Sequence, residues 1–148
     1  MHIDIALHNS ALVAYSVTCL VLSGNLVFLW GYSGFVRSKT KIAINPEDSV
    51  LYGVALAEND PPDVARVLRA HSNAQANIYP FLILGLIFIL NDGSTITAEV
   101  TFGVFTIARI GHSFAYLAGK QPWRTISFIT GGLATIALMI EIIFLLLS

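Results

Sequence analysis

Long apolar stretches alternate with short polar ones along the chain, and their length favours helices over strands. The apolar stretches cover about residues 11–36, 61–90, 96–119 and 123–147. Each supplies the roughly 20 residues that an α-helix needs to cross the hydrocarbon core of a bilayer. The short turns NDGS and GKQP follow the second and third stretches, so successive helices there should be antiparallel. The pattern predicts an all-α integral membrane protein, a four-transmembrane-helix bundle.

The second stretch is longer than a bilayer requires. It opens with NDPPD, in which an aspartate, prolines and an acidic first turn form a helix-start signal. A helix over residues 61–90 would measure about 45 Å, against a hydrocarbon core of about 30 Å. Its first turns should therefore stand in the headgroup layer or in water, together with Arg66 and Arg69.

Composition agrees with a membrane setting and excludes several kinds of site. Of the 148 residues, 55% are apolar and 11% are charged, whereas a soluble domain carries roughly 25% charged residues. The mean hydropathy is +0.74. The single Cys19 excludes an internal disulfide and a multi-cysteine metal site. The chain has no basic tract of the kind that would indicate a nucleic-acid partner. We expect one membrane domain over residues 1–148.

Positive charges are distributed unevenly between the polar segments. All eight lie in or beside the first and third loops: Arg37, Lys39, Lys41, Arg66, Arg69, Arg109, Lys120 and Arg124. The NDGS turn carries none. Because loops rich in lysine and arginine stay in the cytosol, the first and third loops should be cytosolic and both termini should lie on the opposite side.

A polar face runs along the third predicted helix. Arg109, His112, Ser113 and Tyr116 are spaced i, i+3, i+4 and i+7, so they share one side. An arginine facing lipid at that depth would cost at least about 2.5 kcal/mol on insertion scales. This face should therefore look into the bundle or into a wet cavity.

The second helix carries a matching face made of Arg66, Arg69, Asn73 and Asn77. A short turn joins the two helices, so the two faces can oppose each other near the cytosolic surface. Arg37 and Arg124, at the ends of the other two helices, would complete a ring of guanidinium groups. An arginine fork binds carboxylates through two hydrogen bonds, so the ring predicts a receptor for an anion with several carboxylates.

Plainer interpretations of the same residues stay open. Arg66 and Arg69 can simply extend to the cytosolic surface, and Arg109 can be a structural arginine paired with Glu99 or with a nearby carbonyl. His112 alone is typical of a hydrogen-bonded packing residue. Since no carboxylate or second histidine shares its face, no metal site is predicted.

Three segments occur in the order KIAINPEDS, RVLRAHSNAQANIYPF and ARIGHSFAYL…PWRT, within roughly residues 37–125. They resemble the MAPEG family (membrane-associated proteins in eicosanoid and glutathione metabolism), most nearly its microsomal prostaglandin E synthase branch. The resemblance implies four-helix protomers in a homotrimer, with glutathione in a polar cleft between subunits near the cytosolic side. It also implies a lipophilic small-molecule substrate that arrives from the bilayer.

The resemblance further implies roles for individual residues. Those matching positions around glutathione are Arg37, Arg69, Asn73, His112, Tyr116, Arg124 and Thr125. Arg124 matches an arginine that stabilises the thiolate, Thr125 keeps the hydroxyl of a serine, and Asp48 matches an aspartate implicated in the chemistry. Arg66, Arg109 and Asn77 are expected to support the anion site. A nearby guanidinium lowers the pKa of a thiol and so increases the reactive thiolate fraction.

Three positions depart from the family pattern. The family has a glutamate at the position of Ala65, an arginine at Ser72 and, at Ala76, an acid that helps to hold glutathione. Losing the acid at Ala76 removes a partner for the ligand's ammonium group. Two functions therefore stay open. One is a glutathione-dependent transferase, peroxidase or isomerase acting on a lipophilic electrophile, and the other is a non-catalytic lipid-binding scaffold that does not use glutathione.

The charge asymmetry generates a test of orientation. Single cysteines introduced into the GKQP turn should be shielded from an impermeant thiol reagent in intact cells, whereas cysteines in the NDGS turn should be labelled. A Cys19→Ser background removes the native thiol. The reverse labelling pattern would overturn the orientation.

Overall fold

Helices dominate the computed structural model, which describes residues 10–147. Four of its five helices are long: α1 (Ser10–Thr40), α3 (Pro62–Leu90), α4 (Thr95–Leu117) and α5 (Trp123–Leu147). The segment between α1 and α3 holds β1 (Ile42–Ala43), α2 (Pro46–Tyr52) and β2 (Ala55–Leu56). The fold class is therefore all-α, with one short strand pair.

The long helices begin and end near the predicted stretches, but the first loop has structure that the pattern did not indicate. α1 continues to Thr40. The strands β1 and β2 pair in parallel, with Ile42 opposite Ala55 and Ala43 opposite Leu56. These segments are too short for either helical or strand periodicity to be recognised. We call residues 41–57 the loop lobe.

Membrane-spanning character is clear in three of the long helices. By length and composition, α1, α3 and α5 can cross a membrane, with hydropathies of 2.0, 1.6 and 2.2 over 18 residues. The 23-residue α4 is not among them, and it buries Arg109, His112 and Ser113 against its neighbours. That α4 also crosses the membrane stays a prediction.

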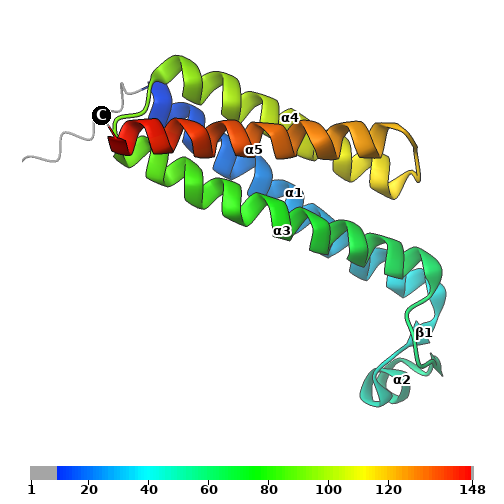
Figure 1. Ribbon diagram of the computed structural model, residues 1–148. Helices are drawn as coiled ribbons and strands as arrows, with labels where there is room; N and C mark the ends of the chain where they lie inside the picture. The colour runs from blue at the N-terminus through cyan, green and yellow to red at the C-terminus, as the bar shows by residue number, and fades with distance from the viewer. Residues whose placement is uncertain (1–9, 148) are drawn as a thin grey trace, which may run out of the picture.

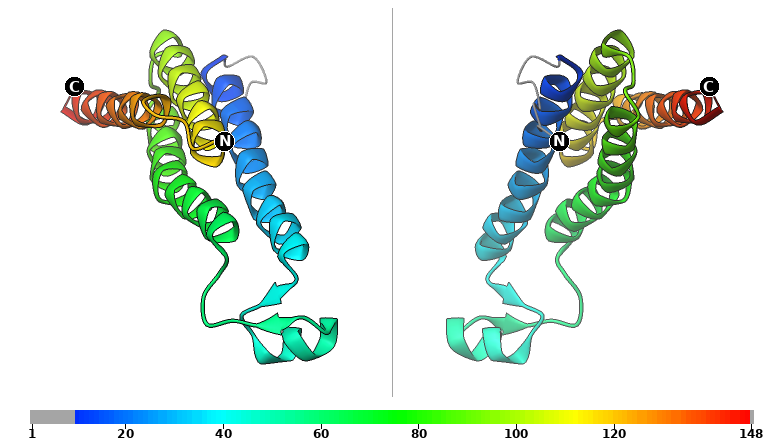
Figure 2. Two further views of the ribbon diagram at one scale, coloured as in Figure 1. Left: turned by 90° about the vertical axis from the view of Figure 1, so that its right-hand side faces the viewer. Right: turned by 90° about the vertical axis from the view of Figure 1, so that its left-hand side faces the viewer.

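The long helices form a bundle in which α1 and α5 do not touch. α1 packs on α3 and α4, and α5 packs on α3 and α4 as well. α1 and α4 run in one direction, while α3 and α5 run back (Figure 1). The loop lobe and the α4–α5 turn lie at the same end of the bundle (Figure 1), and Figure 2 shows the lobe connecting the diverging ends of α1 and α3. The cationic segments are thus brought to one end. The predicted location of the termini involves residues 1–9 and 148, which lie outside the described residues.

Buried positions recur with alternating spacings of three and four residues. In α1 they include Thr18, Leu22, Asn25 and Leu29, and in α3 Ile78, Phe81, Gly85 and Phe88. This heptad spacing keeps one seam of each helix facing its neighbour along its length.

Two hydrogen bonds fix α1 against α4. Thr106 Oγ1 donates to Thr18 Oγ1 at 3.4 Å, and Asn25 Nδ2 donates to Ser113 Oγ at 3.0 Å. Each pair is separated by 88 residues in sequence. Because both pairs have the same offset, they belong to one register, one heptad apart on each helix. Such bonds contribute roughly 0.6–2 kcal/mol each within a membrane.

α3 approaches α1 closely at Gly85. A Cβ atom at this position would lie 3.0 Å from Cε2 of Tyr15 and 3.3 Å from Cε1 of Phe102. The ring of Tyr15 is held in place, because its hydroxyl donates to the Leu82 carbonyl at 3.0 Å and its ring packs on Phe102 with centroids 5.9 Å apart. The close approach of the two helices therefore requires a residue without a side chain.

A Gly85→Ala substitution should consequently destabilise the protein by about 1–3 kcal/mol, because overpacking outweighs the gain in helix propensity. Unfolding in detergent micelles measures the change. Gly103→Ala is the matched control, since a Cβ there meets nothing within 4 Å, and should be neutral or stabilise by up to about 1 kcal/mol. Equal effects of the two substitutions would contradict the proposed packing constraint.

Candidate functional site

Arg109 lies at the centre of the polar group formed by α3, α4 and α5. Its side chain is 0% exposed, and its Nη2 donates to Asn73 Oδ1 at 2.7 Å and to the Asn73 carbonyl at 3.4 Å. Its Nε and Nη1 are buried without a hydrogen-bond partner among the described residues. Of the two structural pairings considered for Arg109, the one with Glu99 is wrong, because Glu99 is exposed. The one with a nearby carbonyl is present at Asn73, whose side-chain amide is a further partner. A buried charge of this kind depends strongly on its few partners.

His112 connects α4 to the start of α5. Its Nδ1 lies 3.0 Å from the carbonyl oxygen of Arg124. A carbonyl can only accept, so Nδ1 carries the proton in this contact. The imidazole ring packs against Tyr116 and Phe128, with centroids 5.6 and 5.9 Å away, and its Nε2 is buried without a partner in the described part of the chain. These contacts are also those expected of a hydrogen-bonded packing residue, which is the plainer interpretation of His112.

Arg124 is oriented by two neighbours at the loop end of the bundle. Its guanidinium carbon lies 4.8 Å from the centroid of the Tyr116 ring, a cation–π contact. With the Gln121 amide in the orientation that matches donors to acceptors, its oxygen accepts from Arg124 Nη2 at 2.8 Å and from Nε at 3.2 Å. The same amide then donates to Thr125 Oγ1 at 3.0 Å. Arg124, Tyr116 and Thr125 thus form one group with Gln121.

Sequence reasoning missed Gln121. The residue belongs to the turn GKQP, which was considered only for its length. The available signal was its spacing from Arg124 and Thr125, three and four residues ahead, which places side chains together at a helix start.

Two further arginines of α3 have different surroundings. Arg66 is exposed, and its Nη1 would lie 2.9 Å from a Cβ atom on Gly119, so its guanidinium covers the end of α4. Gly119 also has a φ of +64°, which favours glycine. Arg69 is exposed. Asn77, also on α3, is half-buried, and its side chain donates to the Asn73 carbonyl at 2.8 Å. The structure therefore gives Arg66 and Asn77 structural contacts.

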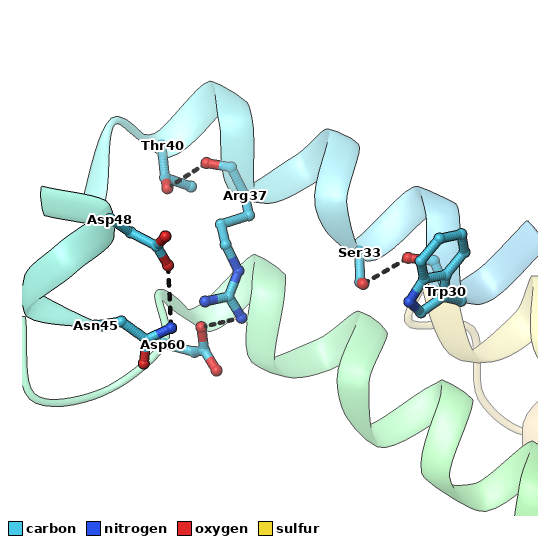
Figure 3. A network of polar contacts seen from close by, with 7 residues as sticks. All are labelled: Trp30, Ser33, Arg37, Thr40, Asn45, Asp48 and Asp60. Atoms are coloured by element: carbon cyan, nitrogen blue, oxygen red, sulfur yellow. Dashed lines mark hydrogen bonds and ion pairs between the residues drawn. The ribbon is translucent and has the colours of Figure 1, made fainter. Parts of the chain in front are cut away.

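Arg37 and Asp48 lie apart from this group. Arg37, in the last turn of α1, forms an ion pair with Asp60, with Nη2 and Oδ1 2.7 Å apart (Figure 3). Asp48 is in α2, where its Oδ2 accepts from Asn45 Nδ2 at 3.0 Å (Figure 3). Because α2 packs only on β1 and β2 among the elements, a single chain does not bring Asp48 against Arg124. Arg37 is kept from Arg124 as well, because α1 and α5 do not pack on each other. The predicted ring of guanidinium groups is therefore not formed within one chain.

Within residues 10–147, no group of three or more histidine, cysteine, aspartate or glutamate side chains could hold a metal ion.

The sequence matches a known family along most of the chain. Residues 15–144 match the MAPEG family. The chain belongs to the MAPEG family. The resemblance that the sequence suggested is thus confirmed, and with its three long apolar helices this MAPEG member is an integral membrane protein.

Individual MAPEG relatives are similar over nearly the full chain. Prostaglandin E synthase of Equus caballus is 32% identical over 136 residues, covering 91% of this chain and 89% of its own. Prostaglandin E synthase of Homo sapiens is 30% identical over 141 residues, covering 95% and 93%. Microsomal glutathione S-transferase 1 of Rattus norvegicus is 35% identical over 130 residues, covering 83% of each chain. Similarity to both kinds of enzyme places the chain in a glutathione-related family without selecting one reaction.

The environment of Arg109 yields a stability test. Asn73→Leu removes the side-chain oxygen that accepts from Arg109 at 2.7 Å and should destabilise the protein by about 3–5 kcal/mol, because the buried charge keeps only the longer contact with the backbone carbonyl. Asn77→Leu, which loses one hydrogen bond along its own helix, should cost about 1 kcal/mol. Asn73→Asp, which offers Arg109 a carboxylate, should be tolerated better than Asn73→Leu. Unfolding in mixed micelles measures all three, and similar losses for the two leucine variants would contradict this role of Asn73.

Proposed function

We propose that this protein is a glutathione-dependent membrane enzyme, a transferase, peroxidase or isomerase acting on a lipophilic electrophile, in which Arg124 stabilises the glutathione thiolate. The observation that carries the proposal is the ordered guanidinium of Arg124, held between Tyr116 and Gln121 at the cation-rich end of the bundle. A positive group fixed in this way favours the thiolate of a bound thiol over the thiol itself. Thr125, within the same group, supplies a hydroxyl beside it.

The other candidate residues could bind the rest of the glutathione tripeptide. Arg69 is an exposed cation at the same end of the bundle, and glutathione carries two carboxylates for such groups to bind. Asn73, His112 and Tyr116 lie next to Arg109 or Arg124 and would limit the positions that the ligand can take.

Assembly is part of the proposal. We expect a homotrimer of four-span protomers, with the first and third loops in the cytosol and the substrate arriving from the bilayer. The separation of Arg37 and Asp48 from Arg124 within one chain supports this view, because a second protomer could bring the two groups together. Large apolar residues such as Leu20, Ile107 and Leu133 are 75, 76 and 61% exposed in the single chain, which leaves ample surface for lipid and for other protomers.

A non-catalytic, lipid-binding scaffold is the second candidate function. Ala76 favours it, since this exposed position on α3 lacks the acid that the family resemblance led us to expect. Buried Arg109 is compatible with it too, because its guanidinium bonds Asn73 within the bundle. Under this function Arg124 would hold a lipid headgroup or another subunit.

Replacing Arg124 with leucine separates the two functions. If the protein is an enzyme, glutathione-dependent turnover of a generic electrophile should fall at least about 10-fold, equivalent to about 1.4 kcal/mol of transition-state stabilisation. The detergent-solubilised mass should stay that of a trimer. Lys120→Leu removes an exposed cation from the same turn and should leave turnover close to wild type.

A second variant restores the missing acid. Ala76→Glu should tighten glutathione binding through a charge-assisted hydrogen bond to the ligand's ammonium group. If wild type shows no glutathione-dependent turnover and the glutamate variant binds no glutathione, the proposed enzyme function is wrong and the scaffold function replaces it.

A further inference from the structure

A groove of about 310 Å³ opens between α1 and α4, near the start of both helices. This end of the bundle is the one opposite the loop lobe (Figure 1). The lining is mostly apolar and includes Val17 of α1 and Ile107 of α4, both exposed. The groove therefore faces the surroundings of the bundle, and no residue of the group around Arg109 and Arg124 lines it.

Glu99 is the only charged residue in the lining of this groove. The residue is exposed, and its carboxylate forms no hydrogen bond or ion pair with another described residue. α4 begins at Thr95, so Glu99 lies beyond the first turn, in which the helix dipole stabilises an acid. The position of Glu99 at the side of an apolar groove is thus not explained by contacts within the described chain.

Positive charges are absent from this end of the bundle. All eight lysines and arginines lie in or beside the first and third loops. Arg109, the nearest of them along α4, is ten residues away, which is about 15 Å along the helix, and it binds Asn73 in the interior. An acidic side chain at membrane depth is costly unless it is paired. No lysine or arginine of the same chain supplies this pairing for Glu99.

The remainder of the groove provides space next to the carboxylate. From Glu99 to Ile107 the groove follows eight residues of α4, or about 12 Å. Gly103 lies between them in the lining, and a Cβ atom there would meet nothing within 4 Å. Thr18 and Thr106 also line the groove, and their hydroxyl groups are already 3.4 Å apart in a hydrogen bond. The groove thus combines one anionic end with an open apolar body.

We propose that this groove binds a lipophilic amine, whose ammonium group contacts Glu99 and whose apolar chain lies along Gly103 and Ile107. The charge complementarity carries the assignment, because the unpaired carboxylate requires a cation and the rest of the lining requires an apolar chain. A phospholipid headgroup fits less well, since its phosphate would lie close to Glu99 without a cation to bind it. The site is independent of the proposed function, because it shares no residue with the candidate glutathione site.

Photolabelling of the intact protein in phosphatidylcholine nanodiscs tests the assignment. The probe is dodecylamine with a diazirine in the middle of its chain, and mass spectrometry locates the labelled peptides. Labelling should concentrate on the parts of α1 and α4 that line the groove. Unlabelled dodecylamine should compete at a concentration at least about 5-fold lower than dodecanol, which has the same chain without the charge.

Two variants remove the two properties of the groove separately. Glu99→Gln should lower groove labelling about 5-fold, because the charge of the contact is lost. Its matched control is Glu141→Gln, since Glu141 is an exposed acid near the end of α5 that does not line the groove. Gly103→Leu fills the open space and should lower labelling at least about as much. Gly132→Leu is its control, because this glycine of α5 is equally open and lies outside the groove. Both controls should label as wild type does.

Charge reversal gives a readout that loss of folding cannot produce. In Glu99→Lys, labelling by the amine probe should fall, and labelling by the corresponding diazirine dodecanoate, whose headgroup is a carboxylate, should rise above it. Wild type should show the opposite order. Failure of the preference to reverse would overturn the role of Glu99 as the headgroup contact.

Three further results would overturn the proposal. Dodecanol that competes as well as dodecylamine would show that the groove selects an apolar chain without regard to charge. Unchanged labelling in Glu99→Gln or in Gly103→Leu would place the amine elsewhere. Finally, the labelling is repeated in nanodiscs in which phosphatidylethanolamine replaces half of the phosphatidylcholine. Displacement of the probe by this lipid would assign the groove to a bilayer headgroup instead of a lipophilic amine.

Discussion

The packing of the long helices depends on a buried positive charge that meets no carboxylate among the described residues. Arg109 is completely buried, and within residues 10–147 its guanidinium meets an amide side chain and a backbone carbonyl but no carboxylate. Burial of a charge is tolerated only where its remaining contacts are well placed. α3 must therefore present Asn73 at the level of Arg109. On the other side, a Cβ at Gly131 of α5 would lie only 3.3 Å from Cδ of Arg109, so α5 leaves room for this side chain.

This requirement explains why α4, unlike the other long helices, has no 18-residue stretch apolar enough to qualify as a membrane span. Three of its polar side chains are turned inward, where they bind α1 through Ser113, α3 through Arg109 and α5 through His112. α4 thus contacts all three other long helices through hydrogen bonds, while α1 and α5 never meet. The outward-facing sides of α1 and α5 are correspondingly apolar.

Much of this arrangement follows from the sequence, and the remainder depends on geometry between elements. Helical spacing places Arg109, His112 and Tyr116 on one face, and the cost of exposing an arginine to lipid turns that face inward. Spacing does not give the rotation of α3 about its own axis, so it could not select Asn73 over Glu99 as the partner. The roles of Arg37 and Asp48 came from resemblance, which says nothing about which protomer supplies each residue. The strands of the loop lobe could not be predicted from the sequence, because they have only two residues each.

The two hydrogen bonds between α1 and α4 limit how these helices can move. Thr18–Thr106 and Asn25–Ser113 share one register, so sliding α1 along α4 by a single turn would break both bonds together and would set polar groups against apolar neighbours. A piston-like displacement is therefore excluded at modest energies. The line through the two bonds runs along α1, so the motion that keeps both is a rotation of α1 about that line. A disturbance of the loop lobe would then reach the far end of α1 as a roll, with the two bonds acting as the hinge.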